Sequence, residues 1–190
     1  AVDLKYLGAD NFLGRPVDGY VKSRCILTRE AANALGRVQA ELNRFGLGLK
    51  IFDAYRPQRA VDDFVRWARD LDDLKMKKEF YPNVKKASLF SDGYIASRSA
   101  HSRGSTVDLT IVSLTDNKPG DELDMGSPFD FFDPKSWVNS PELQPQQRAN
   151  RMLLRNIMEK HGFLPYEKEW WHFILKKEPY PKTYFDFPVE

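Results

Sequence analysis

The feature that most constrains the fold is a change of hydrophobic period at Gly46. Over residues 28–45, apolar side chains recur every three or four positions, which is typical of the buried face of an α-helix. Thr28 is a suitable N-cap for this helix, and Gly46 is a suitable end. Over residues 47–51, apolar residues alternate with small or polar ones, as they do in a β-strand. The chain therefore has to combine helices with strands.

Both periods recur further along the chain. Helices are predicted at about residues 58–71 and 145–161, and strands from residue 106 and at about 170–175. Residues 72–97 have no lasting period and are predicted as a long surface excursion with short helical pieces, and residues 115–145 are predicted as mostly loop. This order predicts an α+β fold with a central, mainly antiparallel sheet and helices packed on it, in one domain over residues 1–190.

Charge and hydropathy argue against two classes of protein. The 190 residues include 29 basic and 27 acidic side chains, whereas proteins that recognise nucleic-acid phosphates usually carry a strong basic excess. No apolar run approaches the roughly 20 residues that a membrane-spanning helix needs. We therefore expect neither a nucleic-acid partner nor a membrane span, and the oligomeric state stays open.

Cysteine and histidine limit the metal chemistry. Cys25 is the single cysteine, so neither an intrachain disulfide nor a cysteine-based zinc site can form. Any metal must be held by carboxylates and by the three histidines, His101, His161 and His172. His161 ends a predicted helix just before Gly162, a position that suits the helix dipole better than a metal site.

The first residue bears on the cellular compartment. The chain begins at Ala1 without an initiator methionine, and no charged stretch leads into an apolar segment. This start fits a mature product whose export signal has been removed. It favours the periplasm, with the cytoplasm as the alternative.

Two short segments carry the candidate chemistry. Residues 99–108 read SAHSRGSTVD, and residues 169–172 read EWWH. A catalytic zinc site needs three protein ligands and one open position. His101, Asp108 and His172 supply nitrogen and oxygen donors of the right kind.

The spacing alone leaves the role of these residues open. Gly104 allows the chain to turn between His101 and the strand that carries Asp108. A buried histidine beside an aspartate, however, more often makes a structural hydrogen bond. In an ideal strand Glu169 and His172 face opposite sides, so Glu169 must lie in the turn before the strand if both are to reach one ion.

Several motifs together resemble one known family, the D-alanyl-D-alanine dipeptidases, which are zinc enzymes associated with vancomycin resistance. The matching pieces are KY at residues 5–6, DNF at 10–12, PVDGY at 16–20, DAYRP at 53–57, SRSAHSRGSTVDLT at 97–110, EWWH at 169–172 and YFDFP at 184–188. The resemblance covers nearly the whole chain. More distantly, the chain is similar to the fold group of zinc D,D-carboxypeptidases and the hedgehog signalling domain, so a hedgehog/D,D-peptidase-like fold is implied.

The resemblance implies the reaction and its central residues. It implies hydrolysis of D-alanyl-D-alanine to two D-alanines, with one Zn²⁺ ion per chain held by His101, Asp108 and His172. Glu169 is then the general base. Arg56 is the group that stabilises the negative charge of the transition state.

The resemblance also implies how a small dipeptide is held. Asp130 takes the role of the residue that binds the substrate amine, with Tyr6 and Tyr20 beside the same end. Ser99 takes the role of the contact to the substrate carboxylate. Ala100 stands where relatives can carry a second serine, so a hydroxyl contact from this position is missing.

Two other functions stay open at this point. One is a zinc D,D-carboxypeptidase or endopeptidase that acts on peptidoglycan stem peptides, and Asp130 argues against it because a stem peptide has no free amine there. The other is a zinc-stabilised binding module without turnover. A purely structural site needs neither Glu169 nor Arg56, so their presence argues for an enzyme.

Overall fold

The protein's structure is a computed structural model that describes residues 1–115 and 118–190. Its helices are α1 (Arg29–Asn43), α2 (Gln58–Arg69), α3 (Lys77–Phe80) and α4 (Pro145–Lys160), and its strands are β1 (Leu47–Asp53), β2 (Thr106–Thr115), β3 (Lys118–Glu122), β4 (Phe163–Tyr166) and β5 (Glu169–Leu175). The three predicted helices correspond to α1, α2 and α4, and the three predicted strands correspond to β1, β2 and β5.

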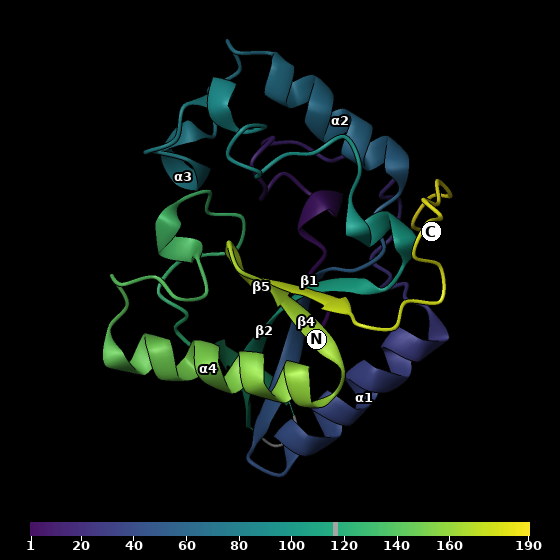
Figure 1. Cartoon of the computed structure of the whole chain (residues 1–190), viewed down its shortest axis with the longest axis vertical. Coiled ribbons are helices and arrows are strands. Elements are labelled where there is room, and N and C mark those ends of the chain that lie inside the picture. Colours follow the sequence, from purple (N-terminus) through teal and green to yellow (C-terminus); the bar gives the residue numbers. More distant parts are fainter. Residues whose placement is uncertain (116–117) are drawn as a thin grey trace.

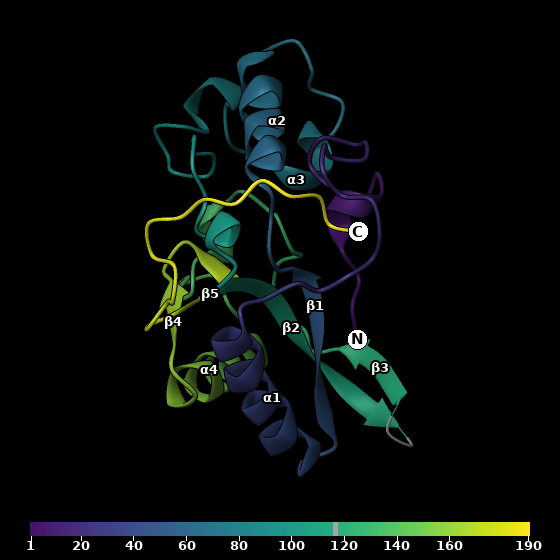
Figure 2. The ribbon, with the colours of Figure 1, turned by 90° about the vertical axis from the view of Figure 1, so that its right-hand side faces the viewer.

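The named strands form one antiparallel sheet. Its order is β1-β2-β5-β4, and β3 pairs with the C-terminal part of β2. α1 packs on β1, α4 packs on β4, and these two helices contact each other. Figures 1 and 2 show α1 and α4 at one end of the molecule and α2 and α3 at the other. The predicted α+β fold is therefore confirmed.

Local sequence explains where α1 begins and ends. The Thr28 hydroxyl accepts a hydrogen bond from the backbone N–H of Ala31, and Gly46 adopts a φ of +67°, which L-residues rarely take. The helix ends at Asn43, earlier than the hydrophobic period indicates. Phe45 therefore lies in the turn, with 71% of its surface exposed, and not in the core.

Two of the strands are missing from the sequence prediction. β3 lies within residues 115–145, which were predicted as mostly loop, and its Pro119 and Gly120 are poor strand formers that only pairing with β2 makes extended. Residues 116–117 of that range lie outside the described part of the chain. β4 has four residues and includes Pro165, so it is too short to show a period.

The segment at residues 72–97 contributes to the core. It contains α3 and a 3-10 turn at Lys86–Ser88, in agreement with the predicted short helical pieces. Tyr81, Leu89 and Ile95 from this segment are nevertheless buried. Because each comes from a different turn, no regular spacing marks them in the sequence.

The last residues hold two earlier segments together. The backbone N–H of Phe185 donates to the carbonyl of Ser102, and its carbonyl accepts from the N–H of Gln58. Asp186 accepts a hydrogen bond from the backbone N–H of Arg59 in the first turn of α2. Figure 2 shows this yellow segment crossing the middle of the molecule.

Within residues 1–115 and 118–190, no helix combines the length and the apolarity that a bilayer crossing requires.

Candidate active site

Strand pairing places three side chains in one row. Asp108 on β2 is the register partner of Asp53 on β1 and of His172 on β5. Side chains of directly paired residues point to the same face of a sheet. The three polar groups therefore project together from the middle of the sheet, although they are far apart in the sequence.

A break in register brings Glu169 to the same place. β4 and β5 pair regularly up to Pro165, but Tyr166 then pairs with Glu169 and leaves residues 170–172 unpaired with β4. The register shifts by an odd number of residues, which reverses the face to which a side chain points. Glu169 Oε2 lies 3.6 Å from His172 Nδ1. Glu169 thus reaches the site as the first residue of β5, and not from a turn before it.

His101 reaches the row from a turn. It lies in the 3-10 turn Ala100–Arg103, which ends at Gly104 with a φ of +75°. His101 Nδ1 lies 2.6 Å from the carbonyl oxygen of Ala54. Since a carbonyl only accepts hydrogen bonds, Nδ1 carries the proton. The lone pair of Nε2 is thus free and faces Asp108.

Donor atoms of three side chains converge at this point. His101 Nε2 lies 3.1 Å from Asp108 Oδ2 and 3.3 Å from His172 Nδ1, and His172 Nδ1 lies 3.0 Å from Asp108 Oδ1. In the described part of the chain, this is the one cluster of such residues able to hold a metal ion. Burial alone would raise the pKa of Asp108, but the two imidazoles outweigh burial and hold it well below its usual value.

Arg56 lies beside the cluster, just after β1. Its Nε donates to Asp53 at 2.8 Å, and its Nη2 lies 3.4 Å from Asp108 Oδ2. The guanidinium also lies 5.0 Å from the ring centroids of Tyr6 and Phe64. Burial opposes its charge, but Tyr6 and the carboxylates outweigh this and hold the pKa of Arg56 well above its usual value. Arg56 is therefore a permanent cation at the site.

Asp53 is a functional residue that the sequence reasoning missed, although it belongs to the DAYRP motif. It accepts hydrogen bonds from Arg56 through one oxygen and from the Tyr20 hydroxyl, at 2.7 Å, through the other. Tyr20 therefore lies against Asp53, and its ring centroid is 5.6 Å from that of Tyr6. The resemblance implied a place for Tyr20 beside Asp130, but its hydroxyl bonds Asp53 and it is not among the residues that line the cavity.

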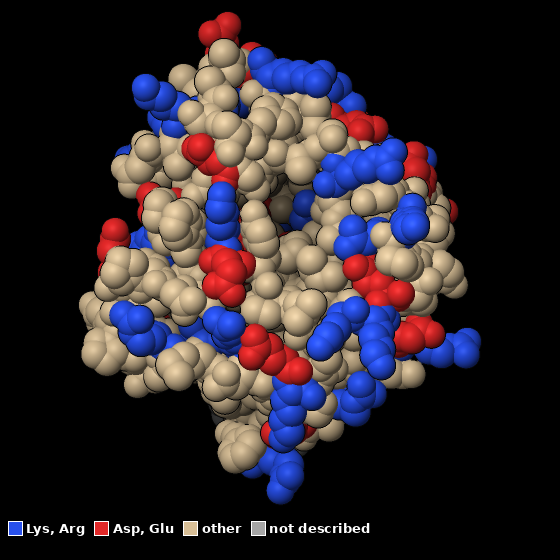
Figure 3. All heavy atoms as spheres, viewed as in Figure 1, with Lys and Arg blue, Asp and Glu red and all other residues tan. Residues whose placement is uncertain are grey.

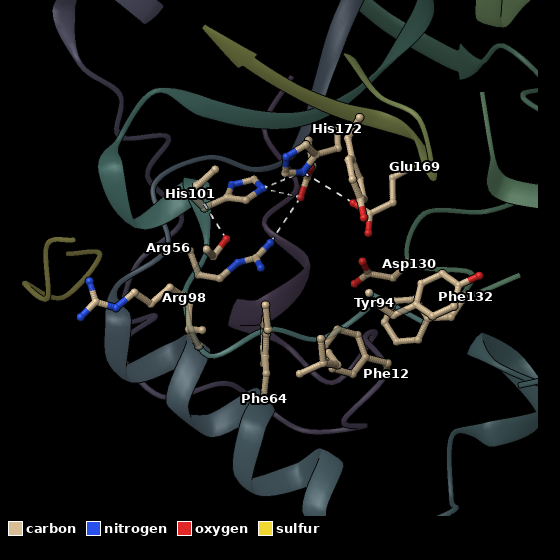
Figure 4. Close-up of a pocket in the computed structure, with 18 of the residues that line it drawn as sticks. Phe12, Arg56, Phe64, Tyr94, Arg98, His101, Asp130, Phe132, Glu169 and His172 are labelled. Atoms are coloured by element: carbon tan, nitrogen blue, oxygen red, sulfur yellow. Dashed lines mark hydrogen bonds and ion pairs between the residues drawn. The ribbon is translucent and has the colours of Figure 1, made fainter. Parts of the chain in front are cut away.

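These groups line a cavity of about 290 Å³. Figure 3 shows its mouth as a hollow on the face seen in Figure 1. In Figure 4, Glu169 and Asp130 point into the cavity, and Phe12 and Phe64 form the wall across from the two histidines. Pockets for drug-sized ligands occupy roughly 300–1,000 Å³, so this one suits a small molecule.

Glu169 has an unusual protonation equilibrium. Its burial raises the pKa of the carboxyl to about 7; His172 opposes this shift, and Asp108 adds to it. A carboxyl group with such a pKa can both accept and release a proton near neutral pH.

Asp130 lies at the end of the cavity away from His101 (Figure 4). Among the residues that the structure describes, it is the one non-glycine residue with a positive φ, +58°. Backbone conformations of this kind are concentrated at functional sites. The Tyr6 hydroxyl donates to Asp130 Oδ2 at 2.8 Å. Burial, with a contribution from Asp108, raises the pKa of Asp130 well above its usual value.

Ser99 lines the cavity next to the first histidine. Its hydroxyl oxygen accepts a hydrogen bond from the backbone N–H of His101 at 3.2 Å. The neighbouring Ala100 lines the cavity without a hydroxyl.

The aromatic wall of the cavity was not predicted. Tyr94 stacks on Phe132 with ring centroids 5.2 Å apart, and Phe132 contacts Phe12 at 5.0 Å. Phe12 could have been found through the DNF motif and Phe64 through the apolar face of α2. Tyr94 lies in the segment without a period, so nothing in the sequence marks it.

The chain matches a known family over its whole length. The family model described as D-Ala-D-Ala dipeptidase, Peptidase_M15, matches residues 1–190. The chain belongs to this family. The family is one of zinc metallopeptidases, so the expectation that the protein is an enzyme of this class is confirmed.

Named relatives agree with the family assignment. The D-alanyl-D-alanine dipeptidases of Streptomyces coelicolor and Enterococcus faecalis are 48% and 47% identical over 187 residues, which are 98% of this chain and 91% of each relative. That of Enterococcus faecium is 44% identical over 188 residues, 99% of this chain and 92% of the relative. A solved vancomycin-resistance D,D-pentapeptidase in complex with Zn(II) covers 83% of this chain and 77% of its own at 13% identity, but its TM-score of 0.48 is too low to add to the assignment.

Proposed function

We propose that the protein hydrolyses the dipeptide D-alanyl-D-alanine to two D-alanines with the help of zinc. One observation carries the proposal: one small cavity holds a cluster of metal donors with Glu169 and Arg56 beside it, and the buried carboxyl group of Asp130 at its other end. The names of the relatives support the same substrate.

The donor cluster fits zinc. Zinc bonds to nitrogen and oxygen of about 2.0–2.1 Å in a tetrahedron separate neighbouring donors by roughly 3.3 Å. The two imidazole nitrogens lie 3.3 Å apart, and each lies 3.0 or 3.1 Å from a different oxygen of Asp108. Asp108 Oδ1 is buried without a hydrogen-bond partner, although an imidazole nitrogen lies close by. His101, Asp108 and His172 would therefore hold the ion, which when bound polarises a carbonyl group and makes water more acidic.

Glu169 supplies the proton transfers in this proposal. Its carboxylate takes a proton from the water molecule that attacks the scissile carbonyl carbon, and then delivers it to the leaving nitrogen. The position of Oε2, 3.6 Å from His172 Nδ1, supports this role because it puts the base beside the donor cluster.

Arg56 stabilises the oxyanion that forms when the carbonyl is attacked. Asp53 holds the Nε edge of the guanidinium, which leaves other N–H groups for the substrate oxygen. Loss of one donor of this kind commonly costs about 100- to 1,000-fold in rate.

Asp130 selects substrates with a free amine. In a buried position its charge is costly, and the ammonium group of a dipeptide compensates it directly. Tyr6 holds the carboxyl group in place through its 2.8 Å hydrogen bond. At the other end, the Ser99 hydroxyl donates to the substrate carboxylate.

The test is a comparison of three substrates with the purified, zinc-loaded enzyme. We expect rapid hydrolysis of D-alanyl-D-alanine, and kcat/KM values lower by at least about 100-fold on its N-acetylated form and on a stem pentapeptide, because both leave Asp130 unpaired. Comparable rates on all three would instead identify a carboxypeptidase of broader range. Zinc binding with no turnover of any of them would identify a binding module.

A further inference from the structure

Arg151 is a buried cation with an unusual set of partners. It lies on α4, and 3% of its surface is exposed. Its Nε and Nη1 donate to the carbonyls of Met125 and Trp137, each at 2.6 Å, and its Nη2 donates to the carbonyl of Lys135 at 3.0 Å. No carboxylate in the described part of the chain forms an ion pair with it, and burial lowers the pKa of Arg151 to about 10.

All these acceptors belong to one loop. Met125 lies at its start, and Lys135 and Trp137 lie at its end, so the planar fork of the guanidinium joins the two ends of residues 125–137. Asp130, with its positive φ, lies midway between them. Figure 1 shows this green loop beside α4.

A chain of hydroxyl groups extends the contact toward Asp130. Arg151 Nη2 also donates to Ser127 Oγ at 3.3 Å. Ser136 Oγ donates its single hydrogen to the carbonyl of Phe131 at 2.6 Å, so Ser127 must be the donor in the 2.9 Å bond between the two serines. The chain of donors therefore runs from the guanidinium to the carbonyl of the residue that follows Asp130.

The start of β5 is joined to the same loop. Trp170 Nε1 donates to Ser127 Oγ at 3.0 Å, and Trp170 directly follows Glu169. Ser127 is thus the point where α4, β5 and the loop meet.

We propose that Arg151 is a positioning residue for recognition of the substrate amine: by closing the loop at residues 125–137, it holds Asp130 in the strained conformation that directs its carboxylate into the cavity. This inference rests on the proposed role of Asp130. A lysine cannot replace Arg151, because a point charge with three donors does not reproduce a planar fork with four bonds.

The experiment is a double-mutant cycle on D-alanyl-D-alanine hydrolysis. Arg151→Lys should lower kcat/KM by roughly 10- to 100-fold, mainly through a higher KM, because small misplacements of a binding group have effects of this size. In an Asp130→Asn background the same change should cost less than about threefold, because the group that it positions no longer binds the amine. The matched control is Arg148→Lys on the exposed side of α4, which should leave both constants unchanged.

Five results would overturn the inference. An equal loss from Arg151→Lys in both backgrounds means that Arg151 only stabilises the fold, and an unchanged kcat/KM means that it positions nothing. If Arg151→Lys does not fold, as judged by circular dichroism, Ser127→Ala takes its place, with a smaller loss of about three- to tenfold and the same non-additivity expected; additivity there overturns the inference as well. An inactive wild type, or an Asp130→Asn variant with unchanged KM, refutes the proposed function itself and the inference with it.

Discussion

Glu169 is the residue on which the proposed chemistry depends most directly. Glu169→Gln keeps the size of the side chain but removes the proton acceptor, so we expect kcat to fall by about 10²- to 10⁴-fold. Zinc content should not change, because the three donors are untouched. Glu167→Gln is the matched control, since Glu167 is exposed two residues earlier in the chain. Retained activity in Glu169→Gln would remove it from the mechanism.

The pKa of Glu169 also predicts a pH dependence. The base acts only when ionised, so kcat/KM falls as pH decreases through the pKa of this carboxyl. Burial raises that pKa to about 7, and a bound cation nearby can only lower it. We expect an acidic limb of unit slope with its midpoint at or below about 7. If kcat/KM stays flat between pH 5 and 7, the midpoint must lie below about 5. The acidic limb should be absent from the kcat/KM profile of Glu169→Gln.

At the scale of elements, two glycines should respond in opposite ways to substitution by alanine. Gly36 lies inside α1 with open space around it, so Gly36→Ala should raise the free energy of unfolding by about 0.5–1 kcal/mol. Gly104 ends the turn that carries His101 at a φ of +75°, and Gly104→Ala should cost about 1–2 kcal/mol. Urea denaturation of both variants measures the difference. A stabilising Gly104→Ala would show that the turn does not need this conformation.

The segment at residues 185–189 also contributes to stability at the scale of elements. Asp186 caps the first turn of α2, and its carboxylate also pairs with the Arg59 side chain at 2.9 Å. Asp186→Ala should therefore lower the free energy of unfolding by about 1 kcal/mol, and Asp186→Asn by less, because the asparagine amide oxygen can still accept the bond from the backbone N–H of Arg59. Thermal melts of the two variants test this order; an equal loss would show that the ion pair, and not the cap, is responsible.

For the whole molecule, the donor cluster links metal binding to stability. An ion that binds the folded chain but not the unfolded one stabilises it by about 2.7 kcal/mol at 100 times its Kd. A chain of this size changes its Tm by roughly 2–4 °C per kcal/mol, so removal of zinc with a chelator should lower Tm by at least about 5 °C and abolish hydrolysis. Added zinc should restore both. In His172→Ala, Tm should no longer respond to zinc, whereas a response equal to that of the wild type would place the ion elsewhere.

The sequence alone determined the elements with a sustained period and the identity of the chemical groups. α1, β1, α2 and α4 follow from spacing that neighbouring residues set among themselves, and the candidate histidine and carboxylate ligands follow from motifs that resemble a family. The sequence alone did not determine β3 and β4, because short strands that contain proline form by pairing with neighbouring strands and not by local preference.

Only the tertiary structure decided how the groups meet. The pairing of Asp108 with both Asp53 and His172, the odd register shift that turns Glu169 toward the site, the hydrogen bond of Tyr20 to Asp53, and the closure of the Asp130 loop by Arg151 all join residues far apart in the chain. The physical reason is that hydrophobic period reports which face of an element is buried, whereas strand register and long-range hydrogen bonds depend on which elements come together.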